Sequence, residues 1–124
     1  MLTLIFLALL QANAGSTATP KPVTNPRELM IEAIDAPDGR ASGVLVGDMA
    51  DAIGQGFGTT APLRIDVTTL KRYRQEGCRR LNVAFSQDGV RMPGESTGNA
   101  RQIDFGIDYC RNGQPPASRT EASP

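Results

Sequence analysis

The residues best suited to chemistry in this chain are two cysteines, Cys78 and Cys110, and thirteen carboxylates, and the chain contains no histidine. Nucleophilic pairs of the Ser–His and Cys–His kinds need an imidazole base, so they are excluded. Zinc and copper sites built on imidazole are excluded for the same reason, and two cysteines so far apart in the sequence do not form a thiolate cage. We therefore expect no metal ion and no cofactor.

The carboxylates offer three further places to look for chemistry. Asp104 and Asp108 share one face of a predicted strand, but four residues of strand separate them by about 13 Å, which exceeds both carboxylate spacings found in glycosidases. Asp48 and Asp51 lie near a predicted helix start, where solvated acidic residues are common. Residues 35–39 lack the ligand count of a calcium loop and are typical of a turn. We expect no catalytic residue, and a hydrolase that uses carboxylates alone is the remaining enzymatic alternative.

The segment 71–80 is strongly basic and contains one aromatic residue. It combines five cations with a tyrosine, which are Lys71, Arg72, Tyr73, Arg74, Arg79 and Arg80. Such a cluster can bind an acidic partner, lipid head groups or a polyanion, so we take it as a candidate docking surface. The alternative interpretation is a solvated strand connection whose charges pair with Glu76, Asp66 and Asp108.

The two cysteines are expected to form a structural disulfide, because their spacing is far from that of a redox Cys-x-x-Cys motif. If Cys78 and Cys110 lie directly opposite each other in a hairpin, the numbers of opposed residues sum to 188. Apolar residues of the two strands then meet on one face, in the pairs Leu81–Ile107, Val83–Phe105 and Phe85–Ile103. A slip of one residue would oppose apolar and polar side chains. The turn falls near Gly94, in a stretch rich in turn residues.

The elements that position these residues are predicted from periodicity. An apolar residue at every fourth position over 45–57 indicates a helix, and alternation over 63–68, 80–85 and 103–109 indicates three strands. Residues 28–35 fit either a helix or a strand, and we favour a strand because a turn follows after only eight residues. The fold class expected is α+β, with one helix packed on a small three- to four-stranded, mostly antiparallel sheet and a C-terminal hairpin stapled by one disulfide.

The beginning of the chain predicts export. A nine-residue apolar run ends before Ala12-Asn13-Ala14, which is typical of a signal peptide over 1–14, although no Lys or Arg precedes the run. Nine residues are fewer than the roughly 20 that span a bilayer, so we expect no permanent membrane anchor. The alternative is a buried N-terminal element of a cytosolic domain. We expect a Pro-rich linker over 15–26, a single globular domain over 27–111 and a disordered tail over 112–124.

The charge balance restricts the function classes. Thirteen basic and thirteen acidic residues give no net charge, so a nucleic-acid binder is not expected. We expect a small, exported, non-catalytic domain of the bacterial cell envelope, periplasmic or secreted, that acts by contact with another envelope protein. An accessory component of a secretion or conjugation apparatus would fit. The alternative is a periplasmic module that binds an anionic ligand or polymer through the 71–80 segment.

Overall fold

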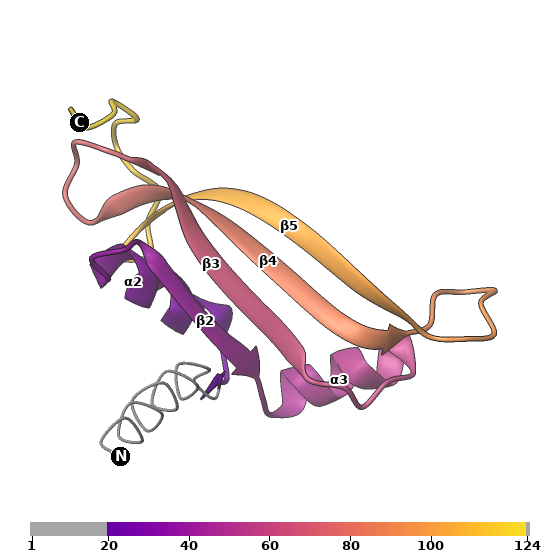
Figure 1. The fold of residues 1–124 in the computed structure, drawn as a ribbon. Helices are drawn as coiled ribbons and strands as arrows, with labels where there is room; N and C mark the ends of the chain where they lie inside the picture. The colour runs from indigo at the N-terminus through magenta and orange to yellow at the C-terminus, as the bar shows by residue number, and fades with distance from the viewer. Residues whose placement is uncertain (1–19, 124) are drawn as a thin grey trace, which may run out of the picture.

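The computed structural model describes residues 20–123, and the expected signal peptide, residues 1–14, lies outside this part. Two helices and five strands follow one another in the order β1 (Lys21–Val23), α2 (Pro26–Asp35), β2 (Arg40–Leu45), α3 (Asp48–Phe57), β3 (Leu63–Arg72), β4 (Cys78–Val90) and β5 (Asn99–Cys110). The strands form one sheet in the order β1-β2-β3-β4-β5 (Figure 1). Strand β1 runs parallel to β2, and every other neighbouring pair is antiparallel. No helix between residues 20 and 123 is long and apolar enough to cross a membrane.

Residues 28–35 form helix α2, so our preference for a strand there was wrong. Asn25 caps the helix by accepting a hydrogen bond from the backbone N–H of Arg27 at 2.9 Å, and the Glu28 carboxylate accepts one from the backbone N–H of Asn25 at 3.2 Å. Pro26 occupies the first turn, where its missing N–H costs nothing. The buried residues are Leu29, Met30, Ala33 and Ile34, the spacing of one helix face. The capping residues decide between two periodicities that the apolar residues alone leave open.

The α+β class and the disulfide are confirmed, but the expected three to four mostly antiparallel strands and single helix are corrected to a mixed five-stranded sheet with two helices. Strand β1 lies inside the segment 15–26, which we expected to be a linker. Val23 is buried against the core, while Lys21 and Pro22 stay exposed at the sheet border. Leu45, which we placed on the apolar stripe of the predicted helix over 45–57, ends β2 instead, and α3 begins at Asp48.

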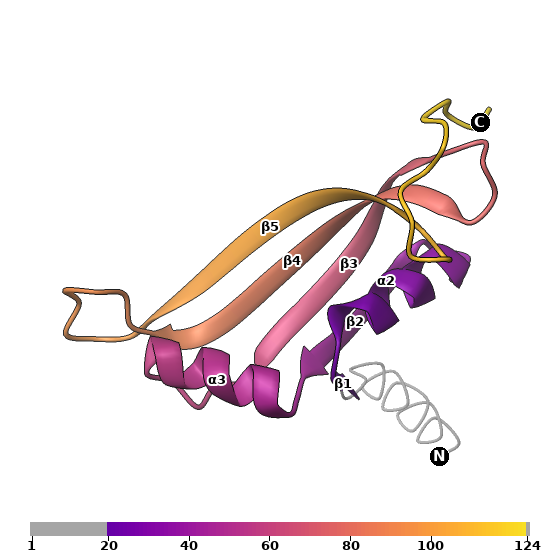
Figure 2. The ribbon, with the colours of Figure 1, turned by 180° about the vertical axis from the view of Figure 1, so that it is seen from behind.

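The hydrophobic core lies between α2 and one face of the sheet. Its largest fully buried side chains come from the helix and from three of the strands, β1, β3 and β4: Leu29, Val23, Ile65, Val67 and Leu81. Gly43 allows close packing here, since a Cβ atom at this position would lie 2.6 Å from the carbonyl oxygen of Lys21 and 3.1 Å from Leu29 Cδ1. Helix α3 lies at the end of the sheet away from the disulfide, beside the start of β3 (Figure 2).

The hairpin register predicted from the cysteines is confirmed. Cys78 lies opposite Cys110 and is disulfide-bonded to it, and all three predicted apolar pairs are present. The strands are longer than expected, and a β-bulge between Gln87 and Val90 separates the main ladder from its last pair. The disulfide therefore joins the open end of the hairpin, and residues 91–98 connect its other end.

Candidate functional site

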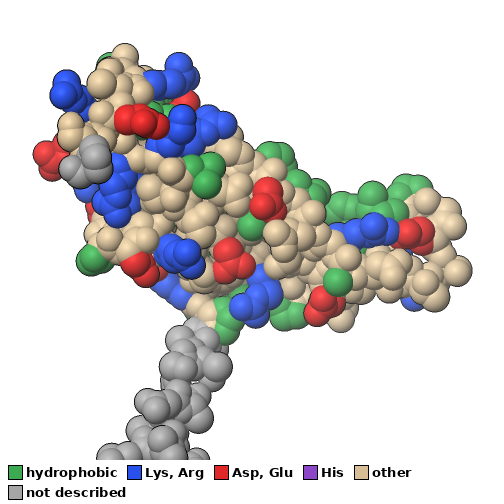
Figure 3. Space-filling view, turned by 45° about the horizontal axis from the view of Figure 1, so that its top comes forward, with side chains coloured by type: hydrophobic (Ala, Val, Ile, Leu, Met, Phe, Trp, Pro, Cys, Tyr) green, Lys and Arg blue, Asp and Glu red, His purple; other side chains and the backbone are tan. Residues whose placement is uncertain are grey.

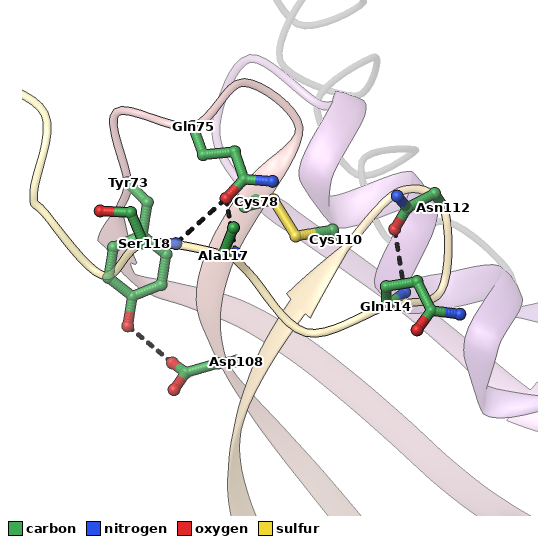
Figure 4. Close-up of a disulfide and its surroundings, with 9 residues drawn as sticks. All are labelled: Tyr73, Gln75, Cys78, Asp108, Cys110, Asn112, Gln114, Ala117 and Ser118. Atoms are coloured by element: carbon green, nitrogen blue, oxygen red, sulfur yellow. Dashed lines mark hydrogen bonds between the residues drawn. A yellow bond between two sulfur atoms is a disulfide. The ribbon is translucent and has the colours of Figure 1, made fainter.

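The basic segment lies where β3 ends and β4 begins, next to the disulfide (Figure 4). Tyr73 is buried, with 8% of its surface exposed, and packs with Cys78 and Cys110 in a small cluster. Its hydroxyl donates a hydrogen bond of 2.6 Å to Asp108 Oδ1. Tyr73 is therefore part of the fold at this end of the sheet.

Asp108 gathers three donors on the sheet face opposite α2. Besides Tyr73, Arg119 Nε donates to Asp108 Oδ2 at 2.6 Å, and Arg80 Nη1 lies 3.3 Å from Oδ1. The hydrogen bond from Tyr73, followed by those from Arg119 and Arg80, lowers the pKa of Asp108 from 3.8 to about 2. The same hydrogen bond raises the pKa of the Tyr73 hydroxyl. This carboxylate thus joins β5 to Tyr73, which directly follows β3, to β4 and to the C-terminal segment.

Arg79 is also engaged within the fold, on the face that α2 covers. Its Nη1 atom donates to the carbonyl oxygen of Ala33 at 3.3 Å and to Thr69 Oγ1 at 3.1 Å, which links the helix to β3. Burial, with a contribution from the charge of Arg72, lowers the pKa of the Arg79 guanidinium. Arg79 and Arg80, adjacent in sequence, therefore hold opposite faces of the sheet.

The last residues of the chain lie along the basic segment. The N–H of Arg74 donates to the carbonyl of Thr120 at 2.8 Å, and the N–H of Ala122 donates to the carbonyl of Arg72 at 2.9 Å. Gln75 Oε1 accepts hydrogen bonds from the N–H groups of Ala117 and Ser118 (Figure 4). The segment that we expected to be a disordered tail thus pairs with residues 72–74, past the end of the β2–β3 ladder.

Three members of the candidate docking surface keep exposed side chains, namely Lys71, Arg72 and Arg74. Lys71 Nζ lies 3.4 Å from Glu121 Oε1, and Arg72 Nη2 donates to the carbonyl of Pro37 at 3.3 Å. The other three, Tyr73, Arg79 and Arg80, are buried or half-buried in the contacts described above. The structure therefore divides the predicted surface into an exposed half and a half that supports the fold.

The remaining carboxylates lie in separate local contacts. Asp104 accepts hydrogen bonds from Asn82 at 3.3 Å and Gln102 at 3.0 Å, and Asp38 accepts one from the N–H of Arg40. Asp48 and Asp51 occupy the first turn of α3. Within residues 20–123 no group of three or more His, Cys, Asp or Glu side chains is placed to hold a metal ion.

Sequence reasoning missed an exposed apolar strip on β5. The exposed fractions of Ile103, Phe105 and Ile107 are 56%, 55% and 37%, although their partners Leu81 and Val83 are buried. Figure 3 shows hydrophobic side chains gathered along this border of the molecule. The Phe105 ring packs edge-on against Phe85, with centroids 5.9 Å apart. Helix α2 lies mainly over β2 and β3 and leaves this part of the same sheet face open.

A second exposed apolar group lies at α3. Met49 and Phe57, two members of the predicted helical stripe, are 51% and 37% exposed, and the neighbouring Val46 is 39% exposed. Ile53 is the member that packs partly against the core. A cavity of about 700 Å³ opens between α3 and the start of β3, with Leu45, Gly54 and Gln87 in its wall.

No family model, curated protein or solved structure matches this chain. The two exposed apolar groups, on β5 and on α3, are the surfaces whose composition is hardest to reconcile with permanent contact with water. They are therefore the candidate functional site, together with the exposed cations Lys71, Arg72 and Arg74.

Proposed function

We propose that this protein is a small, exported, non-catalytic domain of the bacterial cell envelope that acts by protein–protein contact. The observation that carries the proposal is the exposure of the apolar side chains Ile103 and Phe105, each more than half exposed, on the border strand β5. Covering apolar surface is worth about 25 cal/mol per Å², so a partner that covers this strip gains binding energy from it. A polar ligand does not gain this contribution from the apolar strip.

The compartment is supported by two features. The Cys78–Cys110 disulfide is compatible with an oxidising compartment, where such bonds persist. The nine-residue apolar run that precedes Ala12-Asn13-Ala14 is typical of a signal peptide for export. The proposed partner is another envelope protein, and an accessory role in a secretion or conjugation apparatus fits a small contact domain of this kind.

Site-specific photocrosslinking in the source bacterium tests the proposal. A photoreactive amino acid is placed at Phe105 or at Met49, and the matched control carries it at Arg64, an exposed residue on the polar face of the sheet. We expect protein adducts from Phe105 or Met49 and none from Arg64. Adducts at neither apolar position, or equal adducts at Arg64, would contradict contact through the apolar groups.

A further inference from the structure

Strand β5 forms one border of the sheet, and among residues 20–123 no strand lies beyond it. The direction in which its backbone groups point follows from the hydrogen bonds at the disulfide end. The N–H of Tyr73 donates to the carbonyl of Cys78, so Cys78 turns its backbone toward β3. The pair Cys78–Cys110 is therefore a non-hydrogen-bonded pair of the β4–β5 ladder. By alternation, the N–H and C=O groups of residues 102, 104, 106 and 108 point outward, away from β4.

This open edge coincides with the exposed strip of Ile103, Phe105 and Ile107. The strand is twelve residues long and carries no proline. A long border strand with free backbone groups and apolar side chains is a template for pairing with another strand.

The sequence of β5 is complementary to itself in one register. Two copies related by a two-fold axis pair antiparallel about a central residue. With Phe105 at the centre, Phe105 meets its own copy, Ile103 meets Ile107, and Asp104 meets Gly106. All three exposed apolar residues then lie together on one face, as a non-hydrogen-bonded set with Cα atoms about 4.5 Å apart. Gln102 meets Asp108, an amide opposite a carboxylate.

The neighbouring registers are less favourable. A centre at Asp104 opposes that carboxylate to its own copy, and a centre at Gly106 opposes Asp104 to Asp108, which places like charges directly across the strands. A centre at Ile103 puts Phe105 opposite Arg101. A centre at Ile107 leaves only that residue in an exposed apolar pair. The Phe105 register alone joins the full strip without opposing like charges.

We infer that the strand that covers β5 is the β5 of a second copy of this chain, paired antiparallel about Phe105 into one continuous sheet. The inference rests on the proposed function, contact through exposed apolar surface, and names the partner at one of the two apolar groups. The surface of Met49 and Phe57 on α3 stays outside the pairing and remains open to another envelope protein.

The first experiment measures the mass of the full mature chain in solution and the effect of a proline at the edge. The N–H of Asp104 points outward, so Asp104→Pro removes a donor from the edge and none from the β4 ladder. We expect the unmodified chain and the matched control Asp104→Asn to be dimers, and Asp104→Pro to be a monomer with an unchanged circular dichroism spectrum. A monomeric unmodified chain, or a dimeric Asp104→Pro chain, would overturn the inference.

The second experiment tests the register by disulfide trapping with the native disulfide intact. A mixture of the Ile103→Cys and Ile107→Cys variants should form a disulfide-linked dimer that contains one copy of each. Neither variant should form a disulfide-linked dimer with itself. Phe105→Cys should trap its own copy, whereas Asp104→Cys should not. Efficient trapping of Asp104→Cys with itself would overturn the register.

The photocrosslinking experiment separates this inference from the proposed function. Adducts from Phe105 to a second copy support both. Adducts from Phe105 only to a different protein overturn the self-pairing and leave the contact function standing. A dimer in solution without protein adducts from Met49 or Phe105 in cells would overturn the contact function.

Discussion

Replacing Asp108 with Asn keeps the shape of the side chain but removes the charge that three donors share. The pKa of Asp108 lies near 2, compared with 3.8 for the free carboxyl group. A difference of this size corresponds to about 2 kcal/mol of stability at neutral pH. Solvent screening reduces this figure, because the side chain of Arg119 is 69% exposed. We expect Asp108→Asn to lower the free energy of unfolding by about 1 kcal/mol at neutral pH.

The pH dependence of this loss gives the sharper test. The folded pKa lies below the unfolded one, so the folded state binds fewer protons between the two values, and the stabilisation from Asp108 is complete above about pH 5. It is lost as the pH falls through the folded pKa of about 2. Near pH 2.5 about a third should remain. Urea titrations followed by circular dichroism at neutral pH and near pH 2.5 measure both values.

Asp104→Asn is the matched control, since Asp104 lies on the same strand and face but accepts hydrogen bonds only from the neutral side chains of Asn82 and Gln102. Its loss should stay below about 0.5 kcal/mol at both pH values. The account of Asp108 is refuted if Asp108→Asn costs no more than the control at neutral pH, or if its cost is unchanged near pH 2.5. A double-mutant cycle with Tyr73→Phe should show coupling, because the Tyr73 hydroxyl makes the leading contact.

Further effects on stability are predicted from chain entropy, packing and helix capping, and the same urea titration measures each of them. Replacing Cys78 and Cys110 by Ala should cost about 4 kcal/mol, because the bond closes a loop across 32 positions, and an equal stability of oxidised and reduced wild-type protein would contradict this. Gly43→Ala should lower the free energy of unfolding by about 2 kcal/mol, because the new Cβ would lie 2.6 Å from the backbone of β1. Gly56→Ala, which has open space around it in α3, should raise the free energy of unfolding by up to about 1 kcal/mol. The reverse order of the two effects would refute the packing argument. Asn25→Ala should cost about 1 kcal/mol through loss of the α2 cap, and an unchanged stability would show that the cap contributes little.

The hairpin was the part of the fold most accessible to sequence reasoning. Its strands alternate with period two, and the pair Cys78–Cys110 selects one register among those that alternation permits. Two independent signals therefore agree on the same pairing. Residues 28–35 lacked such agreement from the apolar pattern alone. The sequence Asn25-Pro26 with Glu28 is a helix-start signal, and the reciprocal hydrogen bonds of Asn25 and Glu28 in the structure show that this signal outweighs the short distance to the next turn.

The exposure of β5 could not be read from its alternation. An apolar face shows that something should cover it, but the sequence does not show how far a covering helix reaches. A helix is about 10 Å across and strands lie about 4.8 Å apart, so one helix covers about two strands. Helix α2 packs over β2 and β3 and contacts β5 little, which leaves Ile103 and Phe105 outside its cover.

The basic segment shows a different gap. Its charges are visible in the sequence, but the contacts that divide it come from residues 28 to 50 positions away. Asp108 accepts a hydrogen bond from Tyr73 and forms an ion pair with Arg80. The backbone groups of Thr120 and Ala122 form hydrogen bonds with those of Arg74 and Arg72. A segment of Ser, Thr, Ala and Pro has no apolar periodicity that would predict such pairing.

The disulfide at the open end of the hairpin also decides how the chain transmits mechanical tension. A pull on the two ends of the chain reaches Cys78 through β3 and passes across the sulfur–sulfur bond directly to Cys110. Residues 79–109 form the loop that this bond bypasses, so they carry none of the tension. The border strand β5, with Ile103, Phe105 and Ile107, would therefore keep its shape and its contacts while the rest of a tethered domain is stretched.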